Sequence, residues 1–375
     1  MPGPASILHE PRRLGLDAPA PHRRISADTD AMISGLVGFP ERVFVLIALG
    51  TGLLVLALVP PFKGADERAH FLRTYQVSEG TILPEKTPDG VGGFLPGRLK
   101  ARASLVSPPD RTFLDFRNTA LYSPVPYLPQ ATIIGMGRFL DLPPGTLLYL
   151  GRLAGLITAV TLTFLAIRTA PIGKLLFLLM ALTPMAVRQM ALLTADSVSN
   201  ASAFLLIAIF LRLSLDPEMR LQRGVLVLLV LCSLVVVLSK QTYFPLLALY
   251  FLCPVTKAGS RWRYAAIFLI MTGAGLALLA AWSLAIRPLY LPQHIAPGAD
   301  PGRQLAVILA DPIRFALLLL ADLRHDPFRY LGGGHLAYAP RALQRAALAA
   351  IALVDRKSTR LNSSHIQKSR MPSSA

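Results

Sequence analysis

The chain has 375 residues, of which 53% are hydrophobic and 16% charged, and its mean hydropathy is +0.51. This composition excludes an ordinary soluble enzyme and favours a chain that crosses a lipid bilayer several times. The net charge is +17, but the basic residues lie between apolar runs. That placement is typical of topology signals on cytoplasmic loops and excludes a nucleic-acid partner.

Residues 1–40 are rich in Pro, Arg and Ala and lack a sustained apolar period, which predicts a disordered cytoplasmic leader. Five arginines lie before the first apolar run and favour a cytoplasmic N-terminus: Arg12, Arg13, Arg23, Arg24 and Arg42. The run ends at Pro60 and Pro61 and not at a small-residue cleavage site. We therefore expect a retained span and not a cleaved signal peptide.

Long apolar runs predict an all-α fold, a polytopic transmembrane helix bundle that covers residues 41–355. The candidate spans are 43–59, 121–139, 146–167, 175–192, 197–213, 224–239, 241–255 and 264–286, with a broken one at 341–355. Two polar stretches, 60–120 and 287–340, interrupt them and are expected as extracytoplasmic loops. The apolar segment at 313–321 is too short to span.

The last twenty residues, 356–375, replace an Ala- and Leu-rich run with polar sequence that has five Lys and Arg and no acid. They resemble adaptor or vector sequence, so we expect a non-native tail, with a genuine disordered terminus as the alternative. In the first case the natural chain continues beyond Asp355, and its membrane domain is truncated here.

Two basic loops set the expected orientation. One contains Arg212, Arg220 and Arg223 and the other Lys257, Arg261 and Arg263. Both are typical of cytoplasmic loops, yet eight full spans from a cytoplasmic N-terminus would place both outside. We therefore expect one upstream segment to be re-entrant, either the proline-rich 121–139 or 175–192. With that count, loops 60–120 and 287–340 share the outer side with Asp196 and Lys240.

The segment at 60–76, PPFKGADERAHFLRTYQ, follows the first span directly. If it is helical from Asp66 onward, then Asp66, Glu67 and His70 can share a face, because residues three and four apart are neighbours on a helix. Two carboxylates and an imidazole can deprotonate a hydroxyl or hold a divalent cation. The alternative is structural, since acidic residues stabilise a helix N-terminus.

Charged residues inside or beside apolar runs are costly and usually functional. Arg152, Arg188, Asp196 and Lys240 are in such positions. A Lys or Arg at an outer helix end suits a phosphate. The alternatives are snorkelling to the interface for Arg152 and Lys240, and an interhelical ion pair for Arg188 and Asp196.

Five segments in order carry a resemblance: PPFKGADERAHFLRTYQVSEG, NTALYSPVPYLPQAT, YLGRLAGL, TPMAVRQMALLTADSVSNA and LSKQTYFPLL. Over residues 43–340 the chain resembles the bacterial multipass family called domain of unknown function 2142. That family is itself similar to the GT-C glycosyltransferases, inverting membrane enzymes with polyprenyl-phosphate-linked sugar donors and an acidic motif in the first outer loop.

The resemblance implies that Asp66 and Glu67 are the acidic motif, one of them the base that activates an envelope acceptor. His70, Arg152, Asp196 and Lys240 then bind substrate, with Lys240 and Arg152 at the lipid-linked phosphate. The location implied is the bacterial inner membrane. Any divalent cation, the sugar and the acceptor stay unidentified.

Two other function classes remain open. A transporter or flippase for a lipid-linked or anionic solute would place Arg152, Arg188, Asp196 and Lys240 along a pathway. A noncatalytic envelope scaffold would tolerate replacement of Asp66 and Glu67. The acids concentrate in the outer loops and no internal repeat is visible, which favours the enzyme.

Overall fold

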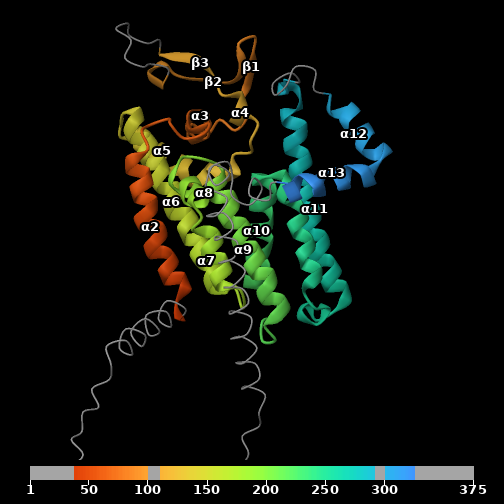
Figure 1. The fold of residues 1–375 in the computed structure, drawn as a ribbon. Helices are drawn as coiled ribbons and strands as arrows, with labels where there is room; N and C mark the ends of the chain where they lie inside the picture. Colours follow the sequence, from red (N-terminus) through yellow and green to blue (C-terminus); the bar gives the residue numbers. More distant parts are fainter. Residues whose placement is uncertain (1–37, 100–109, 292–299, 326–375) are drawn as a thin grey trace, which may run out of the picture. The chain divides into compact units, whose positions relative to one another are not determined.

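The computed structural model describes residues 38–99, 110–291 and 300–325. The predicted leader, the tail at 356–375 and the apolar segment at 341–355 lie outside these residues. The elements below belong to the unit that begins at Pro40 (Figure 1).

Long apolar helices dominate the described residues and confirm an all-α polytopic fold. Four of them are long and apolar enough to cross a membrane: α2 (Pro40–Leu58), α6 (Pro144–Thr169), α9 (Asp196–Leu215) and α11 (Arg261–Ile286). Two bent helix pairs raise the number of candidate spans in the described part to as many as six.

The first bent pair is α7 (Lys174–Ala181) with α8 (Pro184–Ala191), which meet at 66°. Proline at the first turn of α8 lacks the N–H that would continue α7, and the Thr183 hydroxyl accepts a hydrogen bond from the Ala186 N–H instead. Gly151 on α6 lies against Leu193, and Gly155, one turn later, lies against Ser197 at the start of α9, so α6 and α9 run in the same direction. The α7–α8 pair must therefore return across the bundle between them, as a broken span.

The segment 121–139 does not form a full span. It follows α4 (Arg117–Ala120) and holds the 3₁₀ turn η2 (Val125–Tyr127) and α5 (Leu128–Phe139). The 12 residues of α5 rise about 18 Å, well short of a bilayer core of about 30 Å. This length agrees with the expectation that one upstream segment fails to cross, and Pro124, Pro126 and Pro129 explain why no longer helix forms.

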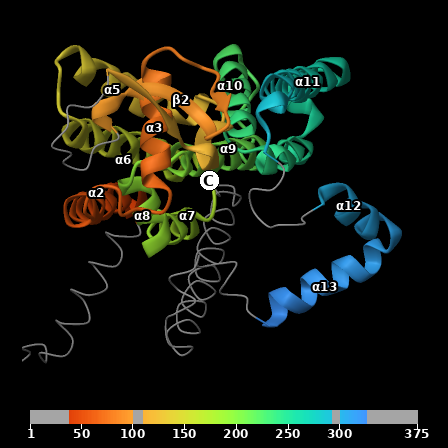
Figure 2. The same ribbon diagram turned by 90° about the horizontal axis from the view of Figure 1, so that it is seen from above.

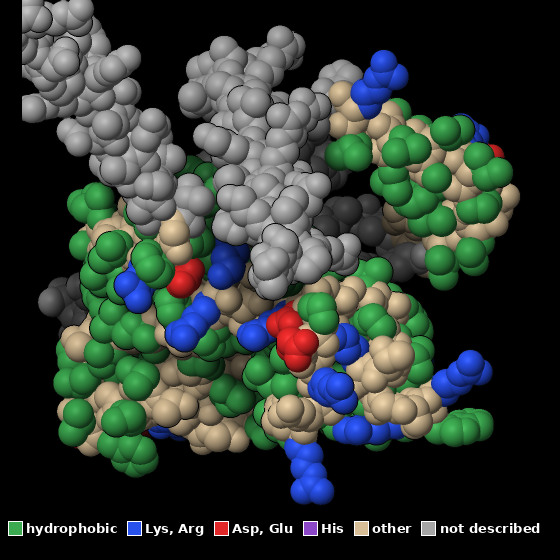
Figure 3. Space-filling model, turned by 90° about the horizontal axis from the view of Figure 1, so that it is seen from below, with side chains coloured by type: hydrophobic (Ala, Val, Ile, Leu, Met, Phe, Trp, Pro, Cys, Tyr) green, Lys and Arg blue, Asp and Glu red, His purple; other side chains and the backbone are tan. Residues whose placement is uncertain are grey.

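Between α9 and α11 lie two further apolar elements, α10 (Arg223–Ser239) and η3 (Gln241–Leu252), a 3₁₀ helix with Pro245 inside it. The two basic loops lie side by side at one end, because the Lys257 ammonium donates to the carbonyl of Asp216 at 2.6 Å and the Arg263 guanidinium donates to that of Leu221 at 3.0 Å. Seen from that end, Lys and Arg side chains are scattered among hydrophobic ones (Figure 3).

The opposite end has a small antiparallel sheet in the order β1 (Glu85–Thr87), β2 (Gly90–Pro96) and β3 (Arg111–Asp115), with Phe94 opposite Phe113. Sequence analysis predicted only a loop here, because the strands are short and rich in glycine. Gly92 is required, since a Cβ there would lie 1.9 Å from the Leu114 carbonyl oxygen.

Helix α3 (Glu67–Ser78) lies between this sheet and the membrane helices (Figures 1 and 2). Apolar side chains from both form one core: Phe71, Leu72, Tyr75, Val91, Leu95, Leu114 and Phe116, with Ile134, Leu147 and Leu148 beneath. The sheet thereby fixes α3 over the ends of α5 and α6.

Beyond α11, η5 (Arg287–Leu289) is followed by the second bent pair, α12 (Pro301–Ala310) and α13 (Pro312–His325). The two helices meet at 100°. The 14 residues of α13 agree with the expectation that the apolar segment at 313–321 is too short to cross alone.

Candidate functional site

Glu67 and Arg152 form a fully buried ion pair. The Arg152 Nε donates to Glu67 Oε1 and an Nη donates to Oε2, both at 2.7 Å, and the side chains are 1% and 0% exposed. Glu67 also accepts from the backbone N–H of Gly64 at 3.3 Å and of Leu193 at 3.2 Å. Each carboxylate oxygen is therefore occupied by protein donors.

The Arg152 guanidinium also donates to three carbonyl oxygens at the end of α2 and directly after it, those of Leu56, Val59 and Pro60, at 2.8–3.2 Å. The pair thus joins α2, α3, α6 and the link between α8 and α9. Both residues were predicted to act on substrate. Those roles stay predictions, and the geometry favours a structural role because neither side chain reaches the surface.

Asp66 is separated from Glu67, although the two are adjacent in sequence. It has φ +51°, an uncommon left-handed conformation for a residue other than glycine, and its side chain is exposed. The Asn118 amide donates to Asp66 Oδ1 at 3.2 Å. The expected convergence of both carboxylates with His70 is wrong, because helix α3 begins at Glu67 and the strained turn points Asp66 outward.

His70 lies one helical turn further along α3 and is 8% exposed. Its Nδ1 is 2.7 Å from the Tyr127 hydroxyl. Burial lowers the pKa of His70 to about 4, while the nearby charges of Asp196, Asp66 and Glu67 raise it and that of Lys240 lowers it further. The imidazole is therefore neutral at pH 7 and lies within electrostatic range of the predicted site residues on α9 and after α10.

Lys240 and Asp196 form an ion pair, with Nζ 2.5 Å from Oδ1 and side chains 33% and 25% exposed. Asp196 begins α9 and Lys240 directly follows α10, so the antiparallel packing of these helices brings residues 44 positions apart together. The predicted ion-pair alternative for Asp196 is confirmed, with Lys240 as its partner.

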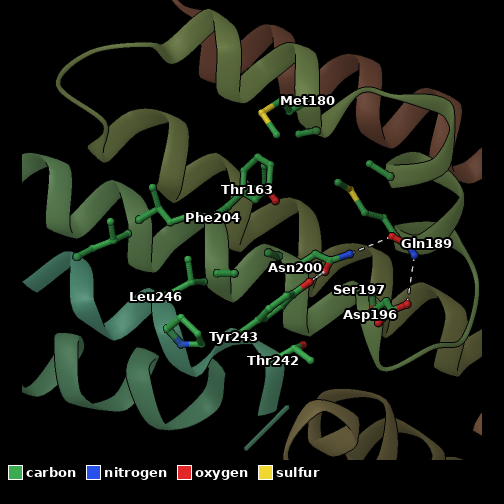
Figure 4. A pocket seen from close by; sticks show the side chains of 18 residues that line it. Thr163, Met180, Gln189, Asp196, Ser197, Asn200, Phe204, Thr242, Tyr243 and Leu246 are labelled. Carbon is green, nitrogen blue, oxygen red and sulfur yellow. Dashed lines mark hydrogen bonds between the residues drawn. The ribbon is translucent and has the colours of Figure 1, made fainter. Parts of the chain in front are cut away.

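Three uncharged side chains extend this pair into the bundle. The Gln189 amide donates to Asp196 Oδ2 at 3.2 Å, the Asn200 amide donates to Gln189 Oε1 at 2.9 Å, and the Tyr243 hydroxyl donates to Asn200 Oδ1 at 2.6 Å (Figure 4). We call Lys240, Asp196, Gln189, Asn200 and Tyr243 the polar chain. Gln189, Asn200 and Tyr243 were missed by sequence analysis, since their partners come from different helices.

A cavity of about 490 Å³ adjoins the polar chain. Four of the five polar-chain residues line it, and most of the rest of its wall is apolar: Met180, Ala181, Ala186, Met190, Ala201, Ala203, Phe204, Ile207, Pro245, Leu246 and Leu249. Figure 4 shows the hydrogen-bonded side chains at one end and Met180 and Phe204 away from them. The fourth predicted charge, Arg188, is on α8 and is half-buried.

Within residues 38–99, 110–291 and 300–325, no three His, Cys, Asp or Glu side chains gather as they would around a metal ion. The set proposed from sequence, Asp66, Glu67 and His70, fails because Arg152 takes Glu67. No residue set is therefore assigned to a divalent cation.

Comparison with known families then identifies the chain. A family described as predicted membrane protein (DUF2142) matches residues 104–354, more than half of the sequence. The chain belongs to this DUF2142 family. No curated protein and no solved structure matches it.

The DUF2142 match includes the segments that carry Arg152, Asp196 and Lys240. It begins after the acidic segment at 60–76, so Asp66, Glu67 and His70 lie outside the matched residues. What the family match establishes is a membrane protein in contact with the lipid bilayer.

Proposed function

We propose that this DUF2142 protein is a GT-C-like glycosyltransferase of the bacterial inner membrane, with a cytoplasmic N-terminus. It would move a sugar from a polyprenyl-phosphate donor to a hydroxyl of an envelope acceptor. One observation supports the proposal: at the end of the bundle opposite the basic loops, the exposed Asp66 carboxylate and the accessible Lys240 ammonium both lie within electrostatic range of the neutral His70 imidazole.

Each of these groups suits one part of the reaction. The Asp66 carboxylate would accept the acceptor's hydroxyl proton as its oxygen bonds to the anomeric carbon. The bond from that carbon to the donor phosphate breaks, and its electron pair leaves with the phosphate oxygen. The Lys240 ammonium would stabilise the charge that develops on the leaving phosphate. The anomeric configuration inverts, because attack and departure occur on opposite sides.

His70 and Glu67 would contribute without accepting the proton. A neutral imidazole held by Tyr127 can donate or accept one hydrogen bond from its free ring nitrogen, which suits orientation of a sugar hydroxyl. The Glu67–Arg152 pair would hold the start of α3, and hence Asp66, in place over the link before Asp196.

The test is turnover by the purified chain, reconstituted in vesicles with a panel of polyprenyl-phosphate sugars and scored by release of polyprenyl phosphate. Asp66→Asn should lower the rate at least a hundredfold, since a positioned general base contributes roughly 10²–10⁴. Asp89→Asn is the matched control, because Asp89 is an exposed carboxylate in the same outer region. Equal rates in the two variants would remove Asp66 from the mechanism.

A transporter or flippase is the second candidate, favoured by the cavity that adjoins a charged pair and runs along the helices of the bundle. It predicts movement of a lipid-linked sugar between leaflets with no release of polyprenyl phosphate. The same vesicles distinguish the two functions, because leaflet exchange and carrier release are measured separately.

A further inference from the structure

The cavity follows two helices inward from the polar chain. On α9, Asp196, Asn200, Phe204 and Ile207 line it at helical spacing, and their 11-residue separation corresponds to about 16 Å along the axis. On η3, Tyr243, Leu246 and Leu249 repeat every three residues, which is the period that places 3₁₀ side chains on one face. The cavity is therefore deep and runs along the helices, over about half of a 30 Å bilayer core.

The walls suit a hydrocarbon chain. Met180, Met190 and Phe204 supply flexible or large apolar surface, and methionine adapts readily to irregular ligands. At the rim, Met180 is 49% exposed, and Thr242 and Pro245 are also exposed. These residues come from α7 and η3, so the wall of the cavity reaches the surface of the bundle at these two elements.

The polar chain gives this apolar space one charged end. Asp196 lines the cavity there, and Lys240 lies directly behind it as its ion-pair partner. A third of the Lys240 side chain is exposed, so an incoming anion can reach its ammonium. In the described structure the Asp196 carboxylate neutralises Lys240. A phosphate can replace it, because Lys binds phosphate as a point charge. Gln189 and Asn200 can then satisfy the displaced carboxylate with their amide N–H groups.

We propose that this cavity binds one hydrocarbon chain of a lipid phosphate, and that the phosphate exchanges with Asp196 as the partner of Lys240. A ligand with an apolar tail about one leaflet long and a single anionic head matches both ends of the space. This assignment deepens the proposed function, since it would place the donor's lipid, but binding itself requires no sugar transfer. A prenyl phosphate and a bilayer diacyl phosphate share this chemistry.

The experiment measures binding of farnesyl phosphate to the full chain in nanodiscs of neutral lipid. Met180→Trp places a larger side chain at the rim of the cavity and should weaken binding at least tenfold. The reason is that excluding two methylene groups of the ligand from the cavity changes its affinity by about tenfold. Leu276→Trp is the matched control: it is also 49% exposed on a membrane helix but lies away from the cavity lining. Its affinity should equal that of the unchanged chain.

The contact between the phosphate headgroup and Lys240 is tested with the variants Lys240→Ala and Lys240→Arg. The alanine variant should lose at least tenfold in affinity and the arginine variant should retain most of it. Farnesol lacks the phosphate and inorganic phosphate lacks the hydrocarbon chain. Each should therefore bind at least tenfold more weakly than farnesyl phosphate. Competition by dioleoyl phosphatidic acid would also support the site and would identify a bilayer phospholipid as its occupant.

Three results would overturn the inference: equal affinity in Met180→Trp and the unchanged chain, equal weakening by Leu276→Trp, or inorganic phosphate binding as tightly as farnesyl phosphate. The outcome is separable from that of the proposed function. If binding follows these expectations and no carrier is released with any donor, the enzyme proposal fails alone. If Asp66→Asn abolishes turnover while Met180→Trp changes neither binding nor turnover, the cavity assignment fails alone.

Discussion

The Glu67–Arg152 pair predicts a large loss of stability when either partner is removed. Arg152→Met keeps much of the side chain's volume but deletes its charge and five hydrogen bonds. Glu67 then keeps only the N–H groups of Gly64 and Leu193. Removal of one partner from a buried pair costs about 3–5 kcal/mol. Since whole domains are stable by roughly 5–15 kcal/mol, this is a substantial share.

The assay is reversible unfolding in mixed micelles by titration with sodium dodecyl sulfate, followed by tryptophan fluorescence. Arg152→Met and Glu67→Leu are measured singly and together, and the double variant should lose less than the sum, because replacing both partners leaves no unpaired buried charge. The control is Arg212→Ala, which removes the half-exposed pair with Asp216 and should cost under about 1 kcal/mol.

Two results would refute this reasoning about Glu67 and Arg152. Losses as small as that of Arg212→Ala would show that the pair does not hold the helices together. Unchanged stability with lost glycosyl transfer in Glu67→Gln would instead give Glu67 the catalytic role that the sequence predicted.

Three further predictions concern the end of the bundle that carries the small sheet. Between pH 6.5 and 4 the unfolded chain takes up a proton at His70 while the folded chain does not, because burial lowers the folded pKa to about 4. Stability should therefore fall by about 3 kcal/mol as the pH drops through that window, and His70→Gln should reduce the slope of unfolding free energy against pH. A double-mutant cycle with Asp196→Asn and Lys240→Met should give a coupling of about 1 kcal/mol by the same titration, since both side chains are partly exposed; zero coupling would mean that the pair does not form. Gly92→Ala should destabilise the chain by roughly 2 kcal/mol, because its Cβ would collide with the Leu114 carbonyl, and normal thermal unfolding of that variant would contradict the β2–β3 register.

Hydropathy and charge predicted most of the membrane architecture. The apolar runs at 43–59, 146–167, 197–213 and 264–286 correspond to α2, α6, α9 and α11, because a helix must satisfy its own backbone in lipid. The conflict between the eight-span count and the basic loops predicted that either 121–139 or 175–192 fails to cross, and in the structure 121–139 forms no helix long enough to span. The predicted placement of Asp196 and Lys240 at one end follows from that corrected count.

Contacts between distant residues were not predictable. Glu67 and Arg152 are 85 positions apart, and nothing in their local sequence distinguishes a buried partner from a substrate ligand. The sheet was missed because its strands are three to seven residues long and glycine-rich. The cavity depends on the bend between α7 and α8 and on the 3₁₀ form of η3. Pro184 and Pro245 show in the sequence where these helices are interrupted, but they do not predict the angle of the bend or the 3₁₀ conformation.

The most direct test of the account is the side of the membrane that Asp66 faces, because the proposed chemistry needs this carboxylate and the donor phosphate in the same compartment. Cells would carry the chain with Cys232 and Cys253 replaced by alanine and a single new cysteine at the exposed position Ala65 or Thr256. A membrane-impermeant maleimide should label Ala65→Cys in intact cells and Thr256→Cys only after lysis. Labelling of Thr256→Cys in intact cells, with Ala65→Cys protected, would contradict the account.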